Sequence, residues 1–180
     1  MNKTTAIKLI DQGESSRRRH LLYVAEADGR KWATNSYWLA PAEWFSVVIG
    51  DDPKVGTWNV KADGWQWEDG PEVARLFPST EHPIIEPVAM RGRPVILDRG
   101  ELPDLALFAD ADGAETALDR RYVDMFRQEA TGPAGSELLF RQENALKPAY
   151  VYRRTTYTSV SMAKTEGWSL TGVLMPVRIS

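Results

Sequence analysis

The sequence predicts an α+β fold in which antiparallel sheets are accompanied by one helix in each half of the chain. Short apolar runs rich in β-branched and aromatic residues recur along the sequence, as in strands. Asp-Gly pairs at 28–29, 63–64 and 112–113 are strong hairpin-turn signals. The segment 119–130 has the apolar spacing of an amphipathic helix. Many short strands with few helices are typical of the α+β class.

In the first half, Pro41 suits the first position of a short helix because its missing N–H would have no partner there. The stretch 75–87 is punctuated by prolines and is expected to be extended. The other elements expected in this half are an edge strand at 4–10, a hairpin of strands 21–25 and 31–39, a helix at 41–49, and a hairpin of strands 57–60 and 65–67.

In the second half, the helix at 119–130 begins with Asp119, a residue type that accepts hydrogen bonds from free backbone N–H groups. Its expected apolar face is formed by Leu118, Tyr122, Met125 and Phe126, and its polar face by Arg120, Asp124 and Arg127. The expected strands are 94–97, 105–109, 137–142, 148–155, 158–162 and 168–177. We divide the chain into halves at 1–87 and 88–180, since each has one helix followed by a hairpin, as in a duplicated small domain.

Composition excludes several kinds of protein. The 180 residues are 43% hydrophobic and 26% charged, which is typical of a globular chain. The absence of cysteine excludes disulfides, thiolate zinc sites and cysteine nucleophiles, and it fits a reducing compartment. No signal peptide and no run of roughly 20 apolar residues is found, so we expect a cytoplasmic protein without a membrane segment.

The net charge of −3 argues against a uniformly basic nucleic-acid-binding protein. Any DNA contact must come from local basic patches, and such runs more often only face water. The sequence has three patches: Arg17-Arg18-Arg19, the set Arg120, Arg121 and Arg127, and Arg153-Arg154.

No catalytic group of residues is found. His20 and His82 are the only histidines, and neither lies in a zinc-binding spacing. The segment 131–136 lacks the lysine of a phosphate-binding loop, and Asp110–Gly113 does not fit a calcium loop. We therefore expect no enzyme activity, no metal and no cofactor.

The chain end carries the most informative motif. Residues 172–180, Gly-Val-Leu-Met-Pro-Val-Arg-Ile-Ser, resemble the end of the bacterial beta sliding clamp, the beta subunit of DNA polymerase III, with Ile179 in place of the usual leucine. Segments 118–123, 137–140 and 144–151 resemble the preceding helix start, strand and turn of that family in the same order. Segments 33–40 and 77–87 resemble its middle domain more weakly.

The resemblance implies a shortened, divergent, DNA-clamp-like chain, encoded by a phage or another mobile element. Family members form rings that encircle duplex DNA, with basic helices lining the hole, and tether a polymerase. The chain would thus be a homo-oligomer that contacts DNA without reading its sequence. The DNA-binding candidates are Arg120, Arg121, Arg127, Arg17, Arg18 and Arg19.

The family also binds partner peptides in an apolar groove. The corresponding residues are Thr34, Tyr37, Trp38, Leu39, Val173, Met175, Pro176, Val177 and Arg178. The same residues could instead fill a core or a seam between subunits. Several features depart from the family: the chain is too short for three clamp domains, little helical sequence lies where the first helix of each half is expected, and Ser36-Tyr37-Trp38 replaces Gly-His-Arg.

Two alternatives remain. The chain could be a clamp-fold protein–protein interaction module that does not form a DNA ring, or a small α+β ligand-binding protein of unrelated function. The second would need a pocket with converging polar groups, for which the sequence has no signal.

Overall fold

The computed structural model describes residues 1–11, 20–66, 72–88, 104–130, 137–159 and 162–177, with backbone only for 155–159 and 162–166. It shows a mixed α/β fold whose described strand pairs are antiparallel. The chain forms two compact units, Met1–Phe77 and Pro78–Ser180, which are described separately below.

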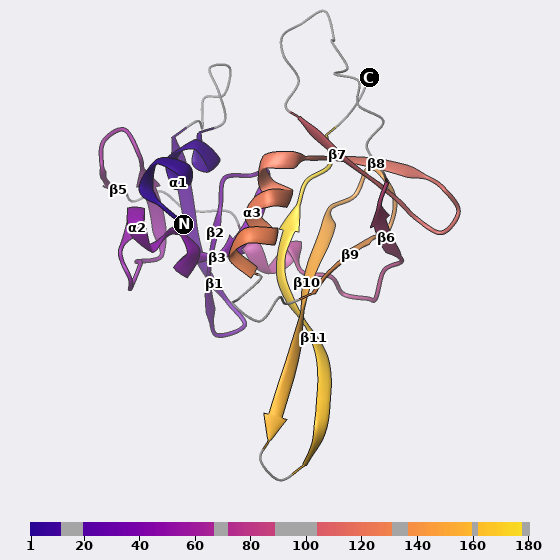
Figure 1. Ribbon diagram of the computed structural model, residues 1–180. Coiled ribbons are helices and arrows are strands. Elements are labelled where there is room, and N and C mark those ends of the chain that lie inside the picture. Colours follow the sequence, from indigo (N-terminus) through magenta and orange to yellow (C-terminus); the bar gives the residue numbers. More distant parts are fainter. Residues whose placement is uncertain (12–19, 67–71, 89–103, 131–136, 160–161, 178–180) are drawn as a thin grey trace, which may run out of the picture. The chain divides into compact units, whose positions relative to one another are not determined.

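The first unit combines a five-strand antiparallel sheet, in the order β5-β4-β1-β2-β3, with short helices (Figure 1). Its elements are α1 (Lys3–Ile10), β1 (Leu21–Ala27), β2 (Arg30–Thr34), β3 (Trp38–Pro41), a 3-10 turn η1 (Ala42–Phe45), α2 (Ser46–Ile49), β4 (Gly56–Asn59), β5 (Gly64–Gln66) and a second 3-10 turn η2 (Val73–Leu76).

The edge strand expected at 4–10 is wrong, because this segment is helix α1. The side chain of Asn2 caps the helix by accepting a 2.9 Å hydrogen bond from the backbone N–H of Thr5. Ala6, Leu9 and Ile10 are buried, and their i, i+3, i+4 spacing places them on one helical face. The first half therefore begins with a helix, for which the sequence has no clear signal.

The Asp-Gly turn is confirmed in the first hairpin of this unit and only in part in the second. Asp28 and Gly29 have φ of 52° and 69°, and they connect the paired residues Ala27 and Arg30. Positive φ at both central residues defines the two-residue turn that Asp-Gly favours. In the second hairpin, Asp63 has φ of 47°, but Gly64 already belongs to β5 and pairs with Asn59, so the connection is the four-residue segment 60–63.

Two other expectations for this unit are wrong in detail. The single strand expected at 31–39 is divided by a turn, in which Ser36 has φ of 80°, so β2 and β3 pair with each other. The helix expected at 41–49 is a 3-10 turn followed by one α-helical turn, and it ends at Gly50 with φ of 84°. The β-branched run in this segment disfavours a longer helix. The 3-10 turn η2, residues 73–76, overlaps only the first two residues of the expected extended stretch 75–87.

The second unit has six strands, in the order β11-β10-β9-β6-β7-β8, and one α-helix among its described residues (Figure 1). Its elements are β6 (Ile84–Pro87), β7 (Leu105–Ala109), β8 (Glu115–Asp119), α3 (Arg120–Ala130), β9 (Leu138–Gln142), β10 (Ala149–Ser159) and β11 (Met162–Leu174). Because β6 pairs with β7 and β9, it belongs to this unit, and the division lies between 77 and 78 rather than 87 and 88. The strand expected at 94–97 lies outside the described residues.

The helix at 119–130 is confirmed as α3, which buries Tyr122, Met125 and Phe126. Leu118 lies instead on β8, a strand that the sequence did not predict, where it pairs with Ala106 of β7. β8 ends at Asp119, so the chain passes directly from strand to helix. In the core of this unit, the ring centroids of Phe108 and Phe140 lie 4.7 Å apart.

The last hairpin is longer than expected. A separate strand at 158–162 is wrong, because Ser159 is the end of β10 and Met162 begins β11. β9 pairs with β10 only as far as Arg153, whereas β10 and β11 continue together to Ser159 (Figure 1). Each unit thus contains a helix followed by three consecutive antiparallel strands, α1 with β1-β2-β3 and α3 with β9-β10-β11.

Candidate functional site

The polar face of α3 contains the arginines expected to contact DNA. Arg120 and Arg127 have side chains about half exposed. Asp124 lies between them: Arg120 Nε is 3.4 Å from Asp124 Oδ2, and Arg127 Nη1 is 3.7 Å from Asp124 Oδ1. The i,i+3 and i,i+4 spacings bring these side chains together on one helical face. Arg17, Arg18 and Arg19 lie outside the described residues.

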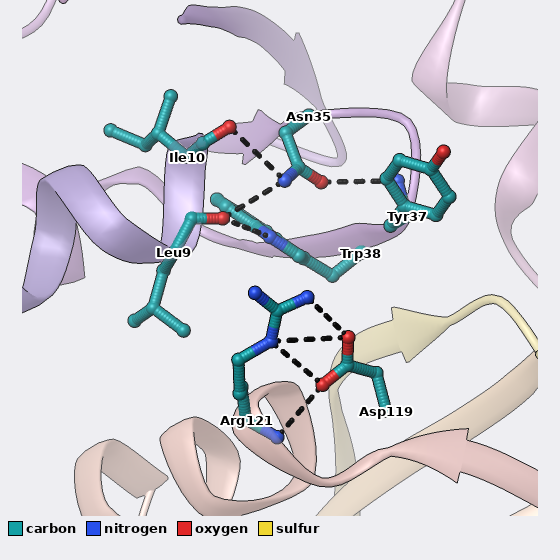
Figure 2. Close-up of polar contacts among 7 residues, drawn as sticks. All are labelled: Leu9, Ile10, Asn35, Tyr37, Trp38, Asp119 and Arg121. Carbon is teal, nitrogen blue, oxygen red and sulfur yellow. Dashed lines mark hydrogen bonds and ion pairs between the residues drawn. The ribbon is translucent and has the colours of Figure 1, made fainter. Parts of the chain in front are cut away.

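Arg121 forms an ion pair with Asp119 at the start of the same helix (Figure 2). Its Nη2 lies 2.6 Å from Asp119 Oδ2, and its backbone N–H donates to Asp119 Oδ1 at 2.9 Å. The Asp119 side chain is only 6% exposed. The hydrogen bond with Asp119 is the main reason that the pKa of Arg121 is raised above its ordinary value.

These pairings determine what the helix offers to a polyanion. Arg120, Arg121 and Arg127 each lie beside a carboxylate, so the local positive charge is largely compensated. Exposed ion pairs contribute only about 0–1 kcal/mol, so a phosphate can displace such a carboxylate at small cost. The pair with buried Asp119 is better fixed, so Arg120 and Arg127 are the better candidates for phosphate contacts.

Replacing Asp119 with alanine is expected to lower the free energy of unfolding by about 1–2 kcal/mol, since it removes the cap at the start of α3 and the partner of Arg121. Urea unfolding monitored by circular dichroism measures the change. Asp124→Ala is the matched control, because its carboxylate is half exposed and forms longer ion pairs on the same helix. Equal effects of the two substitutions would contradict the capping role.

The resemblance motif at the chain end is paired with β8. The backbone N–H of Val177 donates to the carbonyl of Ala117 at 2.8 Å, and Pro176 forms a β-bridge with Leu118. Val173 is 1% exposed, whereas Met175, Pro176 and Val177 are partly exposed. Arg178 lies outside the described residues.

The other residues expected in the peptide groove lie in the first unit, and three of the four are buried. Thr34, Trp38 and Leu39 are at most 2% exposed, and Tyr37 is 47% exposed. Trp38 stacks on Phe45 with ring centroids 4.6 Å apart, and its Nε1–H donates to the carbonyl of Leu9 at 3.2 Å. Trp38 and Leu39 are core residues. This was the alternative interpretation of the residues expected in the groove. The peptide groove itself remains a prediction.

Asn35 is a structural residue that the sequence analysis missed (Figure 2). It is fully buried; its Nδ2 donates to the carbonyl of Leu9 at 2.9 Å, and its Oδ1 accepts from the N–H of Tyr37 at 3.0 Å. The side chain thus joins the end of α1 to the turn between β2 and β3. In turns, an asparagine side chain often accepts a hydrogen bond from the backbone N–H two residues ahead. This tendency is the sequence signal that could have predicted the role of Asn35.

A second feature not predicted from sequence is an aromatic group on the sheet of the second unit. Tyr150 and Tyr152 alternate with buried Val151 along β10, so they share the opposite face. The ring of His82 stacks on Tyr150, with centroids 5.1 Å apart and planes 14° from parallel. Partial burial raises the pKa of both tyrosines.

A groove of about 430 Å³ lies in the second unit where β6 and β9 diverge. Its lining combines six apolar residues with three charged ones, namely Glu86, Arg127 and Glu137. The groove contains no histidine, and its polar groups do not form a recognisable catalytic set.

No group of three or more metal-ligating side chains is found in the part of the chain that the structure describes. Within the same residues, no helix is long and apolar enough to span a membrane. No protein-family model matches the chain, and comparisons with curated proteins and with solved structures give no match.

Proposed function

We propose that the chain is a shortened sliding-clamp-like processivity factor that contacts duplex DNA and tethers a polymerase or another replication protein. The observation that carries the proposal is the context of the Met175-Pro176-Val177 motif. That motif pairs with β8, directly before α3, and α3 is followed by the three-strand meander β9-β10-β11. The motif and the order of the elements that precede it are those on which the resemblance rests.

The mechanism would be topological and electrostatic. A ring around the duplex prevents dissociation without base-specific contacts, and arginines on its inner helices balance the phosphates. Arg120 and Arg127 would have this role, with Asp124 limiting the strength of binding so that the ring can slide. If each unit corresponds to one clamp domain, three copies would complete a ring of six.

Solution mass by light scattering, with and without a closed circular duplex, tests the proposal. We expect an oligomer that stays with circular DNA and is released when the circle is cut. A monomer whose mass is unchanged by DNA would overturn the clamp proposal.

The double substitution Arg120→Ala and Arg127→Ala is expected to weaken duplex binding several-fold and to reduce the slope of log K against log salt by about 2, since each lost phosphate contact lowers the slope by about 1. Fluorescence anisotropy over a salt series measures both quantities. Arg75→Ala is the matched control, because Arg75 is an exposed arginine with an i,i+3 acidic partner in the first unit. An unchanged slope in the double variant would place the DNA contacts elsewhere.

A second candidate is a clamp-fold protein–protein interaction module that does not encircle DNA. The observation in its favour is the carboxylate beside each arginine of α3, which leaves little uncompensated charge on that helix. This candidate predicts a monomer or dimer that ignores duplex DNA but retains a protein partner when Tyr37, the exposed residue of the expected groove, is intact.

A further inference from the structure

The sheet β9-β10-β11 presents an aromatic face, defined here as Arg141, Tyr150, Tyr152, Arg154 and Trp168. The register places Tyr150 opposite Arg141 of β9, and Arg154 opposite Trp168 of β11. Directly opposed residues in antiparallel strands point to the same side, and alternate residues along β10 do as well. The five side chains therefore lie on one side of the sheet.

The aromatic face is accessible, and its arginines are held in place. Trp168 is 43% exposed, and Tyr150 and Tyr152 are partly exposed. Arg141 is fixed by Glu81, at 2.6 Å, and by the carbonyl of His82, at 2.7 Å. Arg154 Nη1 lies 2.9 Å from Glu137 Oε2.

The charge of these strands is opposite to that of the chain as a whole. β9, β10 and β11 together contain four basic residues and one acidic residue, a net charge of +3, whereas the whole chain has −3. The remainder of the chain therefore carries −6. Glu81 and Glu137, at the margin of the aromatic face, offset part of the positive charge. The strands are thus the part of an acidic protein best suited to a polyanion.

We propose that the aromatic face binds single-stranded DNA, with bases stacked on Tyr152 and Trp168 and phosphates near Arg154. Stacking on aromatic side chains of a sheet, beside basic residues that follow the backbone, is how single strands are bound without sequence preference. Tyr150 has a supporting role, because His82 already stacks on its ring.

The charge of the strands favours a nucleic acid over a protein partner. A duplex conceals its base faces, so exposed aromatic rings add little to duplex binding, whereas they add directly to single-strand binding. The choice of DNA over RNA rests on the proposed replication function. This contact is distinct from the duplex contact proposed for α3.

Binding is tested with a fluorescein-labelled oligothymidylate of about 20 nucleotides, by anisotropy at low salt and over a salt series. Tyr152→Ala and Trp168→Ala are each expected to raise Kd roughly tenfold, the usual effect of losing one stacked base. Tyr152→Phe keeps the ring and should bind as the unchanged chain does. Leu146→Ala is the control, because Leu146 is 70% exposed and lies outside the aromatic face, and it should leave Kd unchanged.

The proposal is overturned if the oligonucleotide does not bind, or if the two alanine variants change Kd no more than Leu146→Ala. Tighter binding of oligouridylate would overturn the assignment to DNA. Circular dichroism of each variant separates a lost contact from a lost fold. The mass measurement on circular duplex is independent of these results: single-strand binding without a change of mass would overturn the clamp proposal and support the aromatic face.

Discussion

Trp38→Ala is expected to lower the free energy of unfolding of the first unit by about 3–5 kcal/mol, the range for removing a buried large aromatic side chain. The Trp38 side chain is 2% exposed and stacks on Phe45 with the two ring planes 7° from parallel. Truncation leaves a cavity beside Phe45 and removes the indole hydrogen bond to Leu9. Both effects act on the junction of α1, β3 and η1.

Denaturant unfolding followed by circular dichroism and tryptophan fluorescence measures this change. Trp168→Ala is the matched control, because the same side chain is removed from a site that is 43% exposed, and a change below about 0.5 kcal/mol is expected there. Trp38→Phe keeps most of the stacking area and should fall between the two. Equal destabilisation by both alanine substitutions would show that Trp38 is not a core residue.

The parts of the fold that depend on residues close together in the sequence could be predicted. The Asp28-Gly29 hairpin is encoded by the positive φ that its two residues tolerate, and α3 by the spacing of Tyr122, Met125 and Phe126. The helix α1 could not be predicted, because eight residues contain too few apolar positions to separate a period of 3.6 from one of 2.

The candidate site was less predictable, because it depends on contacts between distant segments. The arginines of α3 could be placed on one polar face from their spacing. The aromatic face could not, since it requires the register by which Arg154 meets Trp168 and Tyr150 meets Arg141. Sequence likewise could not distinguish Trp38 from Tyr37 in the expected groove, because the turn between β2 and β3 decides which of them points inward.

Asn35→Ala is expected to cost about 3 kcal/mol of the free energy of unfolding. It removes the Nδ2 donor to the carbonyl of Leu9 and the Oδ1 acceptor for the N–H of Tyr37, and an unsatisfied buried polar group costs about 1–3 kcal/mol. Because the indole of Trp38 donates to the same carbonyl, the effects of Asn35→Ala and Trp38→Phe should not add in a double-mutant cycle. Additive effects would mean that the two contacts act independently.

Asn35→Asp separates hydrogen bonding from packing, because the side chain keeps its size and its acceptor for Tyr37 but loses the donor to Leu9. An ionised carboxylate buried beside the carbonyls of Leu9 and Ile10 is disfavoured, so the pKa of the introduced acid should be raised in the folded state. A raised pKa confers stability that is full below the unfolded value of about 4 and is lost as the pH rises through the folded value. The free energy of unfolding of Asn35→Asp should be lower than that of the unchanged chain. This difference should shrink toward acidic pH, because the neutral acid can donate a hydrogen bond to the carbonyl of Leu9. A difference in the free energy of unfolding that is constant with pH would indicate that side-chain packing, rather than this hydrogen bond, holds α1 against the turn between β2 and β3.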